Sequence, residues 1–166
     1  DVTIVINNAG GLVKASFLDS PVDDVRREFE TNFYGPLHVT RAFVPIIERN
    51  GGGHLLNVAS VLSWAAISGS YSASKAALWS ATNSLRIELA PMGVHVTGVH
   101  MGYVDTAMAA HAEGPKLLPT QLVTTVYDAV EAGEYEALAD ELTQGVKAAL
   151  SGPLDALYPD LRGTNA

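Results

Sequence analysis

The feature that most constrains the fold is a series of short apolar segments separated by long helical patterns. Residues 2–6 (VTIVI) form a hydrophobic, β-branched run, which predicts a strand buried on both faces, as in a parallel sheet. Further strands are predicted at 54–59 (HLLNVA), at 94–100 (VHVTGVH) and, as a short fourth strand, at 135–139. A chain of this kind folds as alternating strands and helices.

The helical patterns between these strands carry start and stop signals. Ser20 is a suitable N-cap and Pro21 suits the first helical position, so a helix is predicted from there to about residue 48, with a bend near Gly35 and Pro36. Further helices are predicted at 71–89, 119–132 and 140–150. Strands that alternate with helices indicate an α/β fold with a parallel sheet and right-handed crossovers.

The composition is that of a globular chain and excludes several classes of function. The 166 residues are 48% hydrophobic and 17% charged, enough to bury a core. Ten basic and eighteen acidic residues give a net charge of −8, which argues against nucleic acid or an anionic membrane as a partner. The chain has no cysteine and no apolar run long enough to span a bilayer, so we expect a cytoplasmic protein.

In parallel α/β sheets the reactive groups gather at the carboxyl ends of the strands. The loops at 7–10, 60–63 and 101–106 each follow a predicted strand, so we expect them to converge on one edge of the sheet. The helix that carries Tyr71 and Lys75 begins at the same edge.

Tyr71 and Lys75 are the strongest candidates for chemistry on that helix. Four residues turn an α-helix through about 400°, so the two side chains emerge only about 40° apart. A nearby ammonium favours the ionised phenol and lowers the tyrosine pKa, which suits proton transfer. The alternative is a tyrosine and a lysine that share a solvated helix face by chance.

Five segments, taken in order, resemble motifs of the short-chain dehydrogenase/reductase family. They are 7–10 (NNAG), 31–35 (TNFYG), 57–60 (NVAS), 71–75 (YSASK) and 101–106 (MGYVDT). The resemblance implies the C-terminal, catalytic part of the single-domain type: a partial Rossmann-like doubly wound parallel sheet, strands four to seven of the family's sheet, in residues 1–150. Residues 151–166 would form a loose C-terminal tail.

The resemblance also implies roles for individual residues. Tyr71 would give or take the proton, and Lys75 would lower its pKa and hold the nicotinamide ribose hydroxyls. Ser60 would hydrogen-bond the carbonyl oxygen of the substrate, and Asn32 would hold a water that links Lys75 to solvent. The cofactor would be NAD or NADP, with cofactor contacts expected at Asn8, Ala9, Gly10, Tyr71, Lys75, Gly102, Val104 and Thr106.

The partners implied are a small carbonyl or alcohol substrate and a second copy of the chain. A homodimer or homotetramer would form through the helices that contain Asn32 and Tyr71. The segment 101–118 would act as the substrate lid, because loops set specificity. The substrate, its physiological direction and the choice between NAD and NADP stay open.

The sequence departs from the family pattern in several places. The interval from Ser60 to Tyr71 is slightly short, so Ser63 is an alternative catalytic serine, and Met101 replaces the usual proline. No glycine-rich dinucleotide motif follows a strand, because the glycines at 51–53 precede one, so the N-terminal cofactor motif is expected to be absent from this chain. The histidines lack carboxylate partners at ligand spacing and are expected to be core or surface imidazoles rather than metal ligands: His38, His54, His95, His100 and His111.

Two classes of function follow from the sequence. The first is an oxidoreductase that transfers a hydride between a nicotinamide cofactor and a carbonyl/alcohol pair. The second is a truncated, non-catalytic relative that serves only as a binding or oligomerising module. In either class the strand at 2–6 would be an exposed apolar edge, so we expect these residues by themselves to aggregate or to bind dinucleotide poorly.

Overall fold

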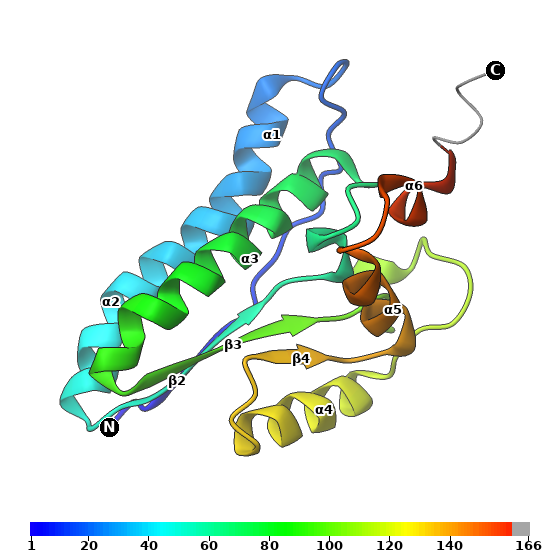
Figure 1. Cartoon of the computed structure of the whole chain (residues 1–166). Helices are drawn as coiled ribbons and strands as arrows, with labels where there is room; N and C mark the ends of the chain where they lie inside the picture. The colour runs from blue at the N-terminus through cyan, green and yellow to red at the C-terminus, as the bar shows by residue number, and fades with distance from the viewer. Residues whose placement is uncertain (161–166) are drawn as a thin grey trace.

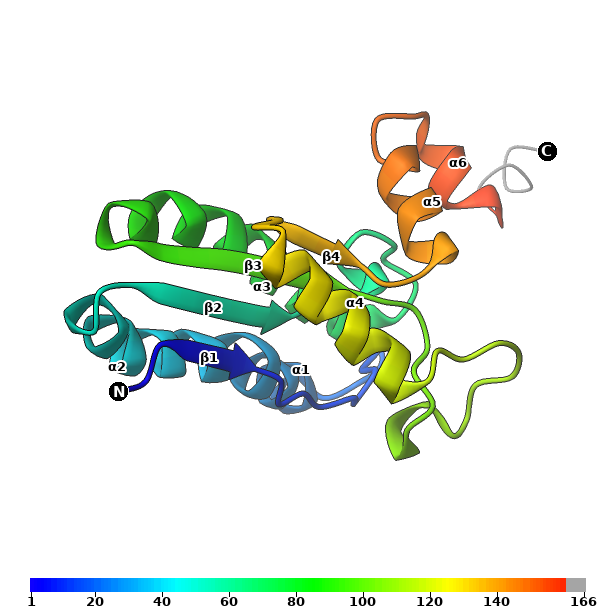
Figure 2. The same ribbon diagram turned by 90° about the horizontal axis from the view of Figure 1, so that it is seen from below.

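The computed structural model describes residues 1–160 and contains a four-stranded parallel sheet with helices on both faces (Figures 1 and 2). The spatial order follows the chain: β1 (Ile4–Asn7), β2 (Gly53–Val58), β3 (Val94–His100) and β4 (Glu136–Leu138). Neighbouring strands are parallel throughout. The predicted α/β class is confirmed, and each strand lies where the apolar pattern predicted it.

Two long helical segments, at 22–49 and 69–89, cover one face of the sheet, and one helix covers the other. The first face carries α1 (Val22–Phe29), the π-helical turn η1 (Glu30–Tyr34), α2 (Gly35–Arg49) and α3 (Gly69–Leu89). On the opposite face α4 (Pro119–Glu131) contacts β4, as Figure 2 shows from below. The chain then continues through α5 (Glu141–Ala149) and α6 (Leu154–Leu157).

The first helical segment differs from the prediction at its start and at its bend. The helix begins at Val22 with Pro21 as its N-cap, because the Ser20 hydroxyl accepts the Ser16 N–H instead of capping the helix. The bend precedes Gly35: the Gly35 N–H reaches back five residues to the Glu30 carbonyl, which makes a wide π-turn. Such turns occur frequently at functional sites, and this one carries Asn32.

The hydrophobic core lies on both sides of the central strands. Between β2, β3 and the helices α2 and α3, one cluster comprises Val5, Val44, Ile47, Leu55, Leu89, Val94 and Val96. A second, smaller cluster of Val99, Met101 and Ala137 lies under α4. The sheet is therefore packed on both faces, by the first cluster near the amino ends of β2 and β3 and by the second near the carboxyl ends of β3 and β4.

The prediction that the first strand is buried on both faces is wrong. β1 is an edge strand, and its side chains alternate: Val5 is 9% exposed, whereas Ile4 and Ile6 are 51% and 52% exposed. The reason is that α2 contacts only one face of β1, and α4 lies over the other end of the sheet. The exposed apolar edge expected from the sequence is present.

The C-terminal segment has more structure than the sequence indicated. α6 forms within it, and the Tyr158 hydroxyl accepts the Ala66 N–H at 2.9 Å, which ties the segment to the loop after β2. The part of the expected tail at 161–166 lies outside the described residues. Among residues 1–160, no helix has the length and apolarity needed to cross a membrane.

Candidate active site

A cleft of about 720 Å³ opens at the carboxyl edge of the sheet. The loops after β1, β2 and β3 meet there, as the strand order predicted. Most of the expected site residues line it: Asn8, Ala9, Gly10, Ser60, Tyr71, Lys75, Gly102, Val104 and Thr106. Asn32 does not line the cleft and lies behind its wall.

Tyr71 faces the cleft but is only 9% exposed. Burial raises the pKa of Tyr71, hydrogen bonding with the Ser60 side chain lowers it, and the negative charge of Glu28 raises it further. The net pKa shift is upward, in contrast to the expectation that Lys75 lowers it. The Lys75 Nζ lies 5.8 Å from the centre of the Tyr71 ring.

Lys75 is 3% exposed, and its Nζ donates a 2.8 Å hydrogen bond to the Val58 carbonyl. Burial lowers the pKa of Lys75 to about 8, because removing an ammonium from water disfavours its charged form. At neutral pH the lysine is still largely protonated. The helical spacing therefore places a buried cation next to Tyr71 at the cleft wall.

The structure separates the two candidate serines. Ser60 lines the cleft, and its hydroxyl accepts the Leu62 N–H at 3.1 Å, which caps the short 3₁₀ turn η2 (Val61–Ser63). Ser63 is 6% exposed, does not line the cleft, and its hydroxyl has no hydrogen-bond partner among the described residues. Only Ser60 stands beside Tyr71.

Asn32 fixes the loop after β1 to the helical layer. Its side chain is fully buried; Oδ1 accepts the Gly11 N–H at 2.8 Å, and Nδ2 donates to the Gly11 carbonyl and to the Ser74 hydroxyl, both at 3.0 Å. A Cβ atom at Gly10 would lie 3.6 Å from both Asn32 Oδ1 and Lys75 Nζ. The asparagine therefore positions the glycine loop that separates it from the cleft.

Glu28 is a buried acid that sequence reasoning missed. It is 1% exposed; its Oε1 accepts the N–H groups of Val13 at 2.8 Å and Lys14 at 3.4 Å, and its Oε2 accepts the Ser70 hydroxyl. A signal was present, because Glu28 precedes Asn32 by one helical turn on the same face. The carboxylate links the loop after β1 to the start of α3.

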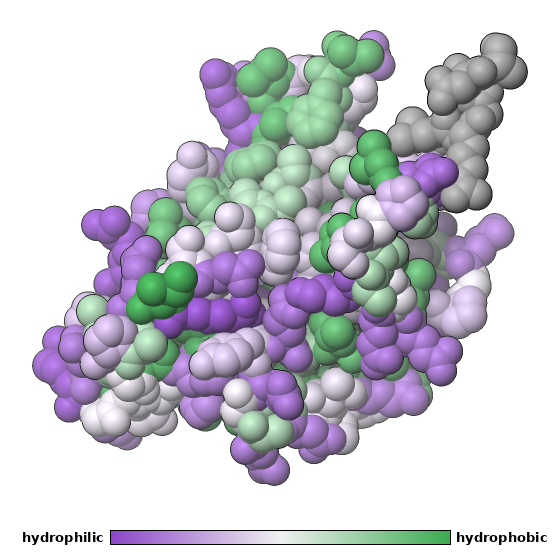
Figure 3. Space-filling model, in the orientation of Figure 1, coloured by the Kyte–Doolittle hydropathy of each residue, from purple (hydrophilic) through white to green (hydrophobic). Residues whose placement is uncertain are grey.

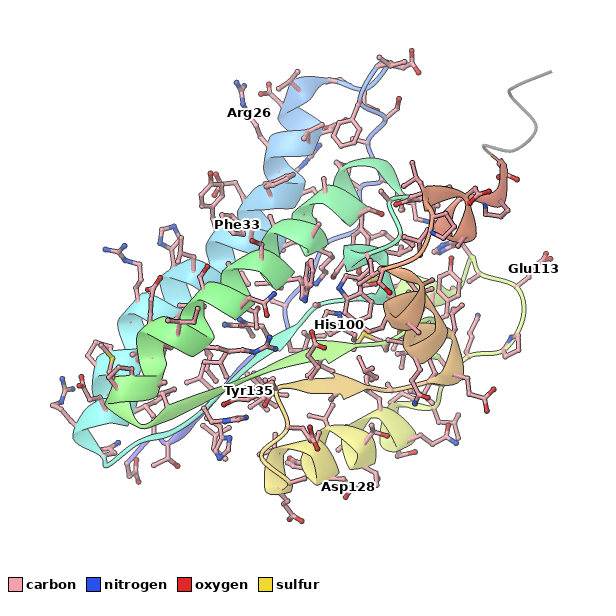
Figure 4. The ribbon with its side chains drawn as sticks, viewed as in Figure 1. Arg26, Phe33, His100, Glu113, Asp128 and Tyr135 are labelled. Atoms are coloured by element: carbon pink, nitrogen blue, oxygen red, sulfur yellow. The ribbon has the colours of Figure 1, made fainter. Side chains whose placement is uncertain are left out.

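His100 and Asp140 support the other side of the cleft. His100, labelled in Figure 4, is fully buried. It stacks on Trp64 at 4.1 Å between ring centres and donates from Nδ1 to the Ser60 carbonyl at 3.1 Å. Burial lowers the pKa of His100 to about 4, so the ring is neutral at pH 7. The Asp140 carboxylate caps α5 and accepts the Gly102 N–H at 2.7 Å, which anchors the loop after β3.

Comparison with protein families and curated proteins gives consistent matches. The family described as short chain dehydrogenase matches residues 1–116. The NADPH-dependent 1-acyldihydroxyacetone phosphate reductase of Schizosaccharomyces pombe is 40% identical over 112 residues, which cover 66% of this chain and 38% of that protein. An uncharacterized oxidoreductase of Staphylococcus aureus is 38% identical over 109 residues, 64% of this chain and 47% of that protein. The matched regions are thus less than half the length of these relatives.

Solved structures match over nearly the whole chain. A short chain dehydrogenase from Burkholderia cenocepacia in complex with NADP superposes with a TM-score of 0.90 at 36% identity, and the match covers 97% of this chain and 69% of that one. A short-chain dehydrogenase from Sphingobium yanoikuyae in complex with NADPH gives a TM-score of 0.80 at 23% identity, with 99% and 68% covered. The second match, at its lower identity, concerns the fold alone.

Proposed function

Because this chain belongs to the short chain dehydrogenase family, we propose that it transfers a hydride between NAD(P)(H) and a carbonyl/alcohol substrate, with Tyr71 as the proton donor or acceptor. The observation that carries the proposal is the joint placement of Ser60, Tyr71 and Lys75 on the wall of one cleft. A hydroxyl, a phenol and a buried ammonium at one point form a proton-transfer and charge-stabilising group.

The cofactor is NAD or NADP, in keeping with the NADP and NADPH held by the relatives from B. cenocepacia and S. yanoikuyae. The cleft residues fit such a group. Side chains are small or absent at Ala9, Gly10 and Gly102, which lets a ligand approach the backbone. Lys75 donates one of its three N–H groups to the Val58 carbonyl, which leaves two for a ligand. We assign the cofactor contacts to Asn8, Ala9, Gly10, Tyr71, Lys75, Gly102, Val104 and Thr106. When bound, the nicotinamide supplies or accepts the hydride.

The chain's own residues manage the proton. Burial keeps the pKa of Tyr71 high, so the phenol stays protonated until a substrate oxygen that gains negative charge accepts its proton. The Lys75 cation then stabilises the phenolate, and Ser60 donates its hydroxyl proton to a hydrogen bond with the same substrate oxygen. Asn32 acts by holding Gly11, and with it the loop beside the cofactor.

We assign the role of substrate lid to residues 101–118. Tyr103, Met108 and Ala109 of this segment line the cleft, and the backbone of Asp105 bonds to Leu117 at the base of the loop. Much of the remaining lining is apolar. The 1-acyldihydroxyacetone phosphate named for the S. pombe relative is therefore a reasonable first substrate to test.

We further propose that residues 1–150 correspond to strands four to seven of the family's sheet, because the five motifs follow one another in the family's order.

The homodimer or homotetramer through the helices that contain Asn32 and Tyr71 also stays a proposal. Figure 3 shows apolar residues gathered over the upper part of the face on which α1 and α3 lie. Exposed Tyr34, Val39 and Phe43 extend apolar surface along η1 and α2. Light scattering coupled to gel filtration measures the oligomeric state.

The test of the proposed function is the Tyr71→Phe variant. The full natural protein is assayed for NADH- and NADPH-dependent reduction of a panel of ketones and aldehydes, and the variant is expected to lose about 10²–10⁴-fold in kcat, since it lacks the proton donor. Tyr127→Phe, an exposed tyrosine on α4, is the matched control and retains full activity. Equal activity of wild type and Tyr71→Phe would refute the assignment, and no turnover of any carbonyl would favour the non-catalytic alternative.

A further inference from the structure

We propose that Lys14 and His111 form a recognition site for an anionic group, a carboxylate or a phosphate, at one end of an otherwise apolar substrate. The proposal rests on the proposed function in one respect, namely that the cleft is the substrate site. It adds the chemical class of the substrate and two residues that the proton-transfer scheme does not use.

The charges around the cleft favour an anion. The whole chain carries eighteen acidic and ten basic residues, yet none of the described residues that line the cleft is Asp or Glu. The basic side chains that line it are Lys14, Lys75 and His111. A cleft without carboxylates in an acidic molecule gives an anion a local attraction.

The rest of the lining indicates what the anion is attached to. Apolar side chains from five separate segments line the cleft, among them Leu12, Val61, Ile67, Met108, Leu122 and Leu157. Such a surface binds a hydrocarbon body through burial of apolar area. The ligand that satisfies both parts is an amphiphilic carbonyl or alcohol with one anionic end.

Lys14 and His111 come from opposite sides of the cleft mouth. Lys14 belongs to the loop after β1 and His111 to the segment 101–118, and the Lys14 Nζ lies 2.8 Å from the His111 Nε2. An ammonium has donors only, so Nε2 accepts and the imidazole proton is on Nδ1. Both residues are exposed; the Lys14 ammonium keeps two further N–H donors for an anion, and its hydrogen bond to His111 holds it across the cleft mouth.

The backbone at Lys14 is held in place by buried groups. Lys14 has a φ of +57°, and no other non-glycine residue among those described has a positive φ. This conformation costs free energy and persists where surrounding structure enforces it. Here the buried Glu28 carboxylate accepts the N–H groups of Val13 and Lys14, and the Ser70 hydroxyl accepts that of Ala15 at 3.0 Å. A buried network thus fixes the backbone from which the Lys14 side chain extends.

Lys75 does not serve as this recognition group. It is buried, it bonds to the Val58 carbonyl, and it stands beside Tyr71 at the proposed reaction centre. Hydride transfer to a neutral carbonyl needs no second cation. The Lys14/His111 pair is therefore available for substrate selection.

The test measures binding rather than turnover, so that its result does not depend on the proposed reaction. Octanoate, octyl phosphate and octan-1-ol are titrated calorimetrically into the full natural protein, with and without NADP⁺. The two anions are expected to bind more tightly than the alcohol, and Lys14→Gln is expected to weaken anion binding about fivefold while leaving octan-1-ol unchanged. His111→Gln is also expected to weaken anion binding.

Lys116→Gln is the matched control, because Lys116 lies on the same segment as His111 but does not line the cleft. It removes the same charge and is expected to leave anion binding unchanged. Equal binding of octanoate and octan-1-ol, an equal effect of Lys14→Gln and Lys116→Gln, or displacement of the anions by NADP⁺ would overturn the proposal. Tyr71→Phe should retain anion binding, which separates failure of this inference from failure of the catalytic assignment.

Discussion

At the scale of single residues, three ionisable side chains besides Tyr71 are buried around the cleft, and each has a different consequence. Glu28 is surrounded by N–H and O–H donors, His100 is neutral and stacked, and Lys75 is charged with one carbonyl partner. A buried ammonium with little compensation destabilises a fold. Lys75 therefore has the character of a group retained for function at the expense of stability.

We expect Lys75→Met to stabilise the protein. The pKa of Lys75 is about 8 in the folded state against a reference near 10.5, so below pH 8 the folded state bears the full cost of the buried charge, on the order of 3 kcal/mol. Between pH 8 and 10.5 the unfolded chain binds more protons than the folded one, and the cost fades. Urea unfolding should show a gain of about 1–3 kcal/mol for the variant at pH 7 and a smaller gain at pH 10. An equal gain in the free energy of unfolding at pH 7 and at pH 10 would contradict this account.

Glu28→Ala should be strongly destabilising. The substitution leaves the N–H groups of Val13 and Lys14 and the hydroxyl of Ser70 without their acceptor, and an unsatisfied buried group costs about 1–3 kcal/mol. We expect a loss of roughly 3 kcal/mol in the free energy of unfolding, measured by urea titration. Glu30→Ala, at an exposed position one residue after α1, is the control and should change it by less than about 0.5 kcal/mol.

At the scale of elements, the cleft depends on where α3 begins relative to the loop after β1. Gly69 starts α3 with a φ of +50°, and a Cβ there would lie 2.3 Å from the Ala15 carbonyl oxygen. In the same contact the Ser70 N–H donates to that carbonyl at 3.0 Å. The backbone at Ala15 therefore lies against the backbone at Gly69. This contact sets the separation between the side of the cleft that carries Lys14 and the side that carries Tyr71.

Gly69→Ala is therefore expected to destabilise the protein by about 2 kcal/mol or more, because of the backbone contact and the unfavourable positive φ. The comparison is Gly145→Ala within α5, where a Cβ meets nothing within 4 Å and alanine is the better helix former. That variant should gain up to about 1 kcal/mol. Thermal unfolding of both proteins under one buffer condition measures the contrast, and equal shifts would show that the contact is unimportant.

At the scale of the whole molecule, the β1 edge is an apolar strand edge open to solvent. Its backbone has a partner on one side only, and Ile4 and Ile6 expose more than half of their surface. An apolar edge strand of this kind promotes pairing with other chains. The overall charge of −8 opposes association but does not cover the edge.

We expect Ile4→Lys combined with Ile6→Lys to reduce self-association of these 166 residues, because charged side chains on an edge strand discourage strand pairing. Dynamic light scattering across a concentration series measures the effect. Ile87→Lys, which changes an equally apolar residue on α3 that is 79% exposed, is the control. A similar reduction from both changes would assign the effect to the general loss of exposed apolar surface rather than to the edge.

The predictions that held depend on local pattern. The strands and helices follow from hydrophobic period and from Pro and Gly breakers, and Tyr71 and Lys75 share a face because helical geometry requires it. The convergence of Asn8, Ser60 and Gly102 follows from a rule about parallel sheets. These features need no knowledge of which residues meet across the core.

The amino-acid pattern alone therefore predicts the class of fold, the order of its elements and the residue types at the candidate reaction centre. Four features appear only in the folded chain: β1 is covered on one face, Glu28 holds the loop carrying Lys14, Lys14 contacts His111, and the pKa of Tyr71 is raised. Burial and long-range contacts set these properties. The contacting residues are separated by up to 97 positions along the chain, and the hydrophobic periodicity of a single helix or strand carries no information about contacts at that separation.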